Sequence, residues 1–133
     1  MIKLFIGGKG SGKTKTLIEL SNNAANTSKG SVICIEKGSK LKHEITYKAR
    51  LIDTDTYAIT DAETLFGFIA GILASNSDIT DIFVDSALKI AGNDVLAFEA
   101  MLPKVKAISE DVNVVMTVSI PVDECPDSIK AYV

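Results

Sequence analysis

The sequence predicts one α/β domain of three layers, with a mostly parallel sheet of about five strands and helices on both faces. Short apolar runs alternate along the chain with longer segments of helical periodicity, which is typical of parallel sheets joined by crossover helices. The apolar runs are nearly continuous, as expected of strands buried on both faces. The chain has 133 residues, of which 47% are hydrophobic, so we expect a single domain over residues 1–133.

The expected strands and helices succeed one another with few interruptions. After the first apolar run, Leu17, Leu20 and Ala24 recur at helical spacing. Thr60 and Glu63 have the spacing of a capping box, so Thr60 is expected to cap the second long helix. We expect strands over 2–6, 31–36, 50–53, 80–85 and 112–119, helices over 13–26, 60–74 and 93–108, and a last helical turn over 127–132.

Three features within this pattern lead to more local expectations. The lysine-rich segment 37–48 alternates apolar and polar residues and is expected to be extended at the edge of the sheet. Gly67 and Gly71 have the spacing that lets helices pack closely, so we expect them to lie against the sheet or a neighbouring helix. Pro103 lacks a backbone donor and is expected to kink or split the third helix.

The segment between the first strand and the first helix carries the most informative pattern. It matches G-x-x-x-x-G-K-[ST] at every required position. Glycines let backbone N–H groups approach an anion closely, and the helix N-terminus adds positive potential. Lys13 is expected to reach the β- and γ-phosphates of a nucleotide, and the Thr14 hydroxyl is expected to bind Mg²⁺. The expected phosphate-binding residues are Gly7, Gly8, Lys9, Gly10, Ser11, Gly12, Lys13 and Thr14.

With this motif the chain resembles the P-loop NTPases. Two acids at strand ends extend the resemblance to their RecA-like branch, with thymidine kinase as a distant likeness. Asp85 ends a strand in the Walker B arrangement, which implies a role in binding Mg²⁺. Glu36 ends the strand after the motif helix, where RecA-like ATPases have their catalytic glutamate. The resemblance implies ATP and Mg²⁺ as ligands, Lys13 and Glu36 as catalytic residues, and the strand order 2–6, 112–119, 80–85, 31–36, 49–53.

Other residues near the expected site leave alternatives open. Thr117 lies where related ATPases keep a residue that senses the γ-phosphate, but its hydroxyl could equally bond to the local backbone. Ser86 stands where many P-loop ATPases have a glutamate, and this favours nucleotide binding over fast hydrolysis. Arg50 is the only arginine, so an arginine finger would be Arg50, a lysine such as Lys89, or a residue of another protein.

These residues are compatible with three functions. The first is a protein that binds MgATP and hydrolyses it slowly, coupled to self-assembly or to binding of a partner protein. The second is a nucleotide-binding switch without catalysis. The third is a small-molecule or nucleoside kinase, which the single arginine disfavours. The sequence contains no guanine-recognition motif, so ATP is the expected nucleotide.

Composition restricts the expected partners and setting. The net charge of −3 does not mark the whole domain as one that binds nucleic acid. Cys34 and Cys125 lie far apart, and neither a signal peptide nor a transmembrane segment is expected, so we predict a cytoplasmic protein without membrane association. One lysine-rich stretch leaves local nucleic-acid binding open, through Lys37, Lys40, Lys42, His43, Tyr47, Lys48 and Arg50.

Overall fold

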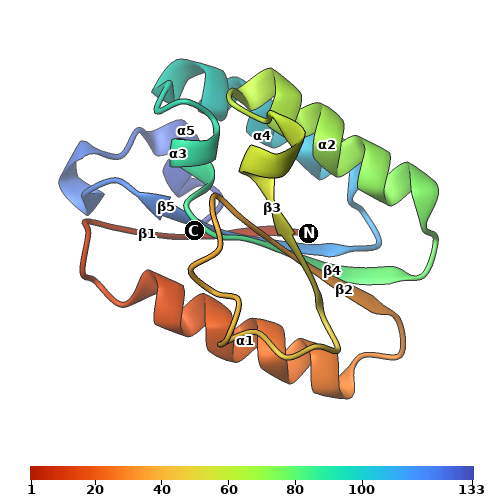
Figure 1. Ribbon diagram of the computed structural model, residues 1–133. Coiled ribbons are helices and arrows are strands. Elements are labelled where there is room, and N and C mark those ends of the chain that lie inside the picture. Colours follow the sequence, from red (N-terminus) through yellow and green to blue (C-terminus); the bar gives the residue numbers. More distant parts are fainter.

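The computed structural model describes residues 1–133 and alternates strands with helices as the sequence predicts (Figure 1). The strands are β1 (Ile2–Gly7), β2 (Ser31–Glu36), β3 (Arg50–Asp53), β4 (Ile79–Val84) and β5 (Asn113–Ser119). The helices are α1 (Lys13–Thr27), α2 (Ala62–Ser75), α3 (Ala87–Ile90), α4 (Val95–Ile108) and α5 (Asp127–Lys130). Helix α3, directly after β4, is the helix that the sequence pattern did not predict.

The sheet has the strand order β1-β5-β4-β2-β3, and every pair of neighbours is parallel. This order confirms the one that the resemblance implied. Strand β5 lies between β1 and β4, because Val114 pairs with Ile2 on one side and with Ile82 on the other. Since all five strands run the same way, their carboxyl ends meet at one edge of the sheet, which is the edge where such folds bind ligands.

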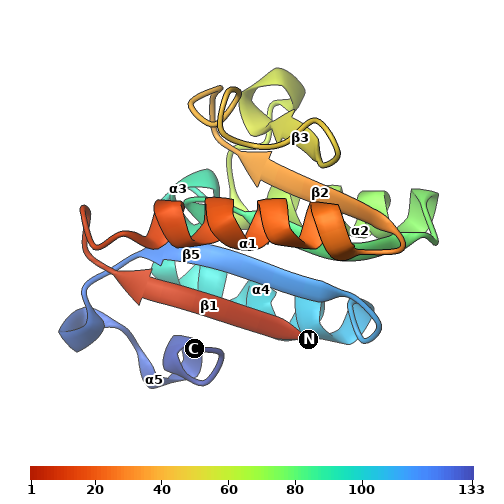
Figure 2. The same ribbon diagram turned by 90° about the horizontal axis from the view of Figure 1, so that it is seen from below.

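The helices form a layer on each face of this sheet. Figure 1 shows α1 on one face and α2, α3 and α4 on the other. Figure 2, seen from the α1 side, shows α5 beyond the outer edge of β1. There the backbone N–H of Leu4 donates to the carbonyl of Tyr132 at 2.8 Å, so the C-terminal turn covers part of an otherwise open strand edge. The predicted three-layer α/β fold is therefore confirmed.

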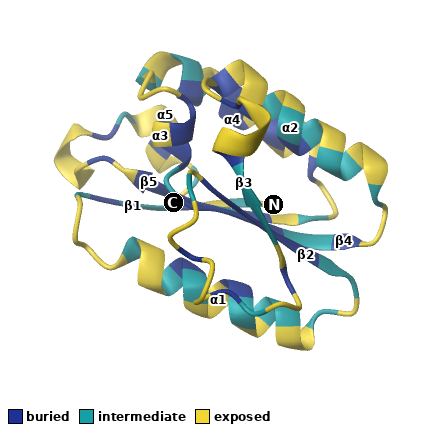
Figure 3. Ribbon diagram, in the orientation of Figure 1, coloured by how far each residue is buried: buried dark blue, intermediate teal, exposed yellow.

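Apolar side chains fill both sides of the sheet, and Figure 3 shows buried strands between helices whose outer sides are exposed. A cluster of 24 buried residues packs against α2, α3, α4 and α5. A smaller cluster of 7 buried residues lies on the α1 face. Only α1 covers that face, so the segment 37–49 supplies part of the cluster through Leu41, Ile45 and Ala49.

The segment 37–49 therefore differs from the extended edge segment that we expected. It is a series of turns between β2 and β3, in which the N–H of Ile45 donates to the carbonyl of Leu41 at 3.1 Å. The spacing of four residues places Leu41, Ile45 and Ala49 on the inner side, against the sheet. Tyr47, which belonged to the expected alternation, is instead 91% exposed.

The start of α2 lies one residue further along than the predicted cap. Asp61, rather than Thr60, is the N-cap, and its side chain accepts from the N–H of Thr64 at 2.8 Å. The Thr64 hydroxyl accepts in return from the N–H of Asp61 at 3.1 Å. The reciprocal pair is a capping box built from Asp61 and Thr64, and it replaces the one expected from Thr60 and Glu63.

The two glycines of α2 do not pack closely, contrary to expectation. A Cβ added at Gly67 or Gly71 would meet no heavy atom within 4 Å. The buried side of α2 is formed instead by Leu65 and Ile69, four residues apart. Gly67 lies two positions from each of them, which is about 200° around the helix and so faces away from the core.

Helix α4 continues through Pro103 as one helix, so the split that we considered does not occur. Leu102 and Val105 are buried on either side of Pro103, whose own side chain is exposed. Packing of these neighbours holds the helix across the position that lacks a backbone donor. None of the helices combines the length and the hydropathy that a membrane span needs.

Candidate functional site

The carboxyl edge of the sheet holds a cavity of about 680 Å³ at the glycine-rich loop. Its walls come from segments that are distant in sequence. The loop and the first turn of α1 form one side, and the connections after β2, β4 and β5 form the rest. The cavity is lined by residues 9–15, Lys40, Ser86, Leu88, Lys89, Asn93 and Ser119.

The glycines of the loop have the conformations that a phosphate cradle needs. Gly7 ends β1 with φ at 152°, and a Cβ there would lie 2.7 Å from Oγ of Ser11. Gly12 has φ at 85° and lies directly before the first residue of α1. Residues with a side chain are strained at these φ values, so the loop keeps this shape only with glycine at positions 7 and 12. The first N–H groups of α1 lack intrahelical partners, and the residues that carry them line the cavity.

Lys13 lies across this loop. Its Nζ donates to the carbonyl of Gly8 at 2.9 Å and to Oγ of Ser11 at 3.2 Å. Burial lowers the pKa of Lys13, and the nearby charge of Asp85 opposes that shift. The ammonium makes no ion pair with a carboxylate, since the one ion pair of the chain joins Lys37 to Asp55 at 2.6 Å. Lys13 is therefore available to an anion that enters the cavity.

Thr14, which lines the cavity, contacts Asp85 behind it although 71 positions separate the two residues. The Thr14 hydroxyl donates to Oδ1 of Asp85 at 3.1 Å. Asp85 is only 9% exposed, and its backbone N–H donates to the carbonyl of Ile35 at 2.9 Å, which fixes the end of β4 against β2. A hydroxyl oxygen and a carboxylate oxygen side by side are the kind of hard oxygen ligands that Mg²⁺ takes. This pair therefore fits the metal that the motif implies.

Thr117 holds the Asp85 carboxylate in place through a hydrogen bond. Its hydroxyl donates to Oδ1 of Asp85 at 2.7 Å and accepts from the backbone N–H of Ser86 at 2.7 Å. Thr117 is 1% exposed and does not line the cavity, whereas Ser119, two residues further along β5, does. The hydroxyl that we considered as a sensor of the γ-phosphate is thus engaged with Asp85 and Ser86.

Replacement of Thr117 by valine is expected to destabilise the fold by about 2 kcal/mol, because a buried carboxylate oxygen loses the closer of its two donors and the partly buried N–H of Ser86 loses its acceptor. Urea unfolding of the variant against the parent measures this difference. Thr117→Ser keeps the hydroxyl and serves as the control, with a smaller expected loss. A valine variant as stable as the parent would contradict a supporting role for this hydroxyl.

Glu36 is buried at the end of β2 and is 3% exposed. Its two carboxylate oxygens accept from the backbone N–H of Leu41 at 3.1 and 3.3 Å. Burial raises the pKa of Glu36, and the backbone hydrogen bonds of Leu41 and Lys40 partly oppose this. Glu36 does not line the cavity at the glycine-rich loop and lies in a second cavity with Lys42. In this arrangement its carboxylate holds the turn after β2.

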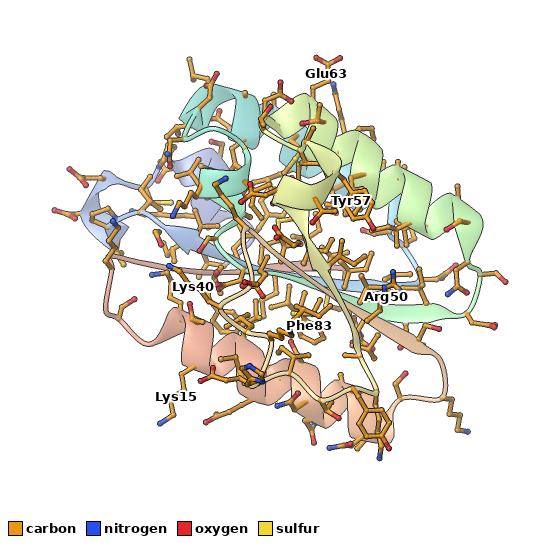
Figure 4. The ribbon with its side chains drawn as sticks, viewed as in Figure 1. Lys15, Lys40, Arg50, Tyr57, Glu63 and Phe83 are labelled. Atoms are coloured by element: carbon orange, nitrogen blue, oxygen red, sulfur yellow. The ribbon has the colours of Figure 1, made fainter.

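The basic residues between 37 and 50 do not form one patch. Lys40 lines the cavity at the glycine-rich loop, whereas Lys37 forms an ion pair with Asp55. Tyr47, Lys48 and Arg50 line a separate groove at the amino end of β3. Figure 4 shows Lys40 toward the N-terminal end of α1 and Arg50 toward the other end of the sheet. Arg50 therefore cannot act as an arginine finger in the cavity of its own chain.

Sequence reasoning grouped Lys40 with the candidate nucleic-acid-binding residues and assigned neither Lys40 nor Asn93 to the nucleotide site. Lys40 was one of several lysines in a polar stretch, and nothing in their spacing separated it from Lys42. The available signal was its position four residues after Glu36, beyond the carboxyl end of a predicted strand. Asn93 lines the cavity from the connection between α3 and α4.

The strand order and the glycine-rich loop after β1 define a P-loop NTPase-like domain of RecA-like topology. The chain is similar to the flagellar accessory protein FlaH from Methanocaldococcus jannaschii, with a TM-score of 0.61, 15% sequence identity, and coverage of 98% of this chain and 65% of that one. It is also similar to PCH-2 of C. elegans, with a TM-score of 0.55, 15% identity, and coverage of 98% and 33%.

At 15% identity these similarities concern the fold alone. The chain spans 65% of the length of the FlaH chain and 33% of that of PCH-2. No protein-family model and no curated protein matches the sequence.

Proposed function

We propose that this protein binds MgATP at the loop 7–14 and hydrolyses it slowly, and that the bound nucleotide controls self-assembly or binding of a partner protein. The proposal rests on the contact between Thr14 and Asp85 near Lys13, at the end of the glycine-rich loop. These three side chains come from two distant parts of the chain, and together they match the needs of a triphosphate and its metal.

Each of these groups has a distinct task in the proposed complex. The N–H groups of the loop and Nζ of Lys13 hold the phosphates, and Lys13 exchanges its contacts with Gly8 and Ser11 for phosphate oxygens. Thr14 and Asp85 hold Mg²⁺, which when bound neutralises charge on the β- and γ-phosphates. Thr117 keeps the Asp85 carboxylate in place through its hydrogen bond.

Glu36 is the proposed general base. A water oxygen attacks the γ-phosphorus, the bond to the bridging oxygen of ADP breaks, and the proton of the water passes to the Glu36 carboxylate. Burial raises the pKa of Glu36, which brings the group nearer the range where a carboxylate accepts a proton effectively. The carboxylate must first leave the N–H of Leu41, and this requirement supports slow rather than fast turnover.

The switch without catalysis is the second candidate. Two observations favour it: Ser86 stands directly after Asp85 where a catalytic glutamate would be, and Glu36 is engaged by the turn after β2. In that case the nucleotide alters the segment 37–49 by binding alone. Binding of MgATP is common to both candidates, so it is the property to measure first.

Lys13→Ala is expected to weaken MgATP binding by about 30-fold, because the phosphates lose a charge-assisted contact. Titration calorimetry with the β,γ-imido analogue of ATP measures the affinity without hydrolysis. Lys29→Ala is the matched control, since Lys29 is exposed and does not line the cavity, and it should bind as the parent does. Equal affinities of the Lys13 variant and the parent would overturn the proposed site.

A further inference from the structure

The phosphate cavity is the cavity at the loop 7–14, where the phosphates of the nucleotide are proposed to bind. Five of its lining residues are lysines, namely Lys9, Lys13, Lys15, Lys40 and Lys89. No aspartate or glutamate is among the lining residues. None of the five takes part in an ion pair, because the one ion pair of the chain lies elsewhere. The lining residues thus concentrate positive charge, with the Asp85 carboxylate behind Thr14, and this favours a ligand with several negative charges.

Lys40 is the one lysine of the five that enters from the β2 side, since Lys89 belongs to α3, which follows β4. Lys9, Lys13 and Lys15 belong to the loop and the start of α1, whereas Lys40 follows β2. Strand β2 neighbours β4, and Asp85 directly follows β4. Thr14 and Asp85 would hold a metal that neutralises charge on the terminal phosphates. A residue that enters from the neighbouring β2 side is therefore placed near the terminal phosphate.

The turn that carries Lys40 is held at several points. The Glu36 carboxylate accepts from the N–H of Leu41, and the N–H of Gly38 donates to Asp53 at 2.8 Å. Leu41 is 4% exposed and belongs to the cluster on the α1 face. Lys40 is the one residue of the segment 37–49 that lines the phosphate cavity, while its neighbour Lys42 does not. The backbone at Lys40 is therefore held in place by the packing and hydrogen bonds of the turn.

We propose that Lys40 binds the terminal phosphate of the nucleotide, and that, in the bound state before hydrolysis, Glu36 positions Lys40 by holding the backbone of Leu41. This inference rests on the proposed binding of MgATP and adds the residue that distinguishes a triphosphate from a diphosphate. It also identifies a positive charge from the same chain in a site that Arg50 does not reach. The contact links the terminal phosphate to the segment 37–49.

Lys40→Ala is expected to weaken binding of the β,γ-imido analogue by about tenfold and to leave ADP affinity within about twofold of the parent, since the lost charge-assisted contact concerns the terminal phosphate alone. Calorimetric titrations of both nucleotides with Mg²⁺ measure the two affinities. Lys42→Ala removes the same charge two residues away and should bind both nucleotides as the parent does.

The outcomes separate this inference from the proposed function. A Lys40→Ala protein that keeps the parent's affinity for the analogue, or that loses affinity for the analogue and ADP equally, overturns the inference while MgATP binding stands. A parent protein that binds neither nucleotide overturns the proposed function and the inference together.

The positioning role of Glu36 has its own readout. Glu36→Ala should reduce the preference for the analogue over ADP, whereas Glu36→Gln should keep it, because the amide oxygen still accepts from Leu41. The double variant Glu36→Ala/Lys40→Ala should bind the analogue no more weakly than Lys40→Ala alone. Circular dichroism confirms that each variant is folded. Additive losses in the double variant would show that Glu36 does not act through Lys40.

Discussion

Glu36→Gln is expected to lower the rate of ATP hydrolysis by at least about 100-fold, because a glutamine amide cannot accept the proton of the attacking water. Binding should persist, since the amide oxygen still accepts from the N–H of Leu41 and keeps the turn after β2 in place. Release of phosphate in a single turnover, with protein in excess over ATP, measures the chemical step apart from product release.

The control for this variant is Glu44→Gln, which removes an exposed carboxylate from the same segment and should hydrolyse ATP at the parent's rate. If Glu36→Gln hydrolyses ATP as fast as the parent, Glu36 is not the base. A parent protein that binds MgATP but releases no phosphate, even when concentrated enough to assemble, supports the switch without catalysis.

Gly30→Ala is expected to destabilise the fold by about 3 kcal/mol, at the upper end of what overpacking of a well-packed site produces. A Cβ at Gly30 would lie 2.0 Å from the carbonyl oxygen of Asp78 and 2.7 Å from Cγ2 of Thr80. That carbonyl also accepts from the N–H of Ser31 at 2.8 Å, where β2 begins to pair with β4. The added methyl group can be accommodated only if this pairing shifts.

Urea unfolding measures the Gly30 variant, and the chain offers a matched control in α2. Gly67→Ala adds the same methyl group at a position where it meets no heavy atom within 4 Å. Alanine favours a helix interior over glycine by up to about 1 kcal/mol, so this variant should be at least as stable as the parent. A Gly30→Ala protein as stable as Gly67→Ala would contradict the close approach of β2 to residue 78.

The strands were predictable because their apolar runs are continuous and bounded by polar or glycine-rich segments. Each of the five strands lies within about two residues of its predicted position. The start of α1 was predictable too, since Gly12 and Lys13 belong to a motif whose loop must end in a helix. The cap of α2 was missed by one residue, because Thr60, Asp61 and Thr64 all have side chains that can cap or bond to backbone.

The shared Mg²⁺ role of Thr14 and Asp85 came from the motif and the resemblance to P-loop NTPases and stays a prediction. Spacing could not have indicated their contact, since 71 positions separate the two residues. The catalytic role of Glu36 came from the same resemblance and stays a prediction. Its hydrogen bonds to Leu41 could not be predicted, because they depend on how the segment 37–49 turns back over the α1 face.

The sequence by itself determined the α/β alternation, the phosphate loop and the acids at the strand ends, because these are properties of short segments. The tertiary structure alone decided which polar residues face the cavity. Thr117 and Ser119 lie two residues apart, yet one is buried under Asp85 and the other lines the cavity, because depth along β5 separates them. Lys40 follows the carboxyl end of β2, whereas Arg50 is the first residue of the parallel strand β3 and so lies at the amino ends of the strands. Although only ten positions apart in sequence, the two residues therefore lie at opposite ends of the strands.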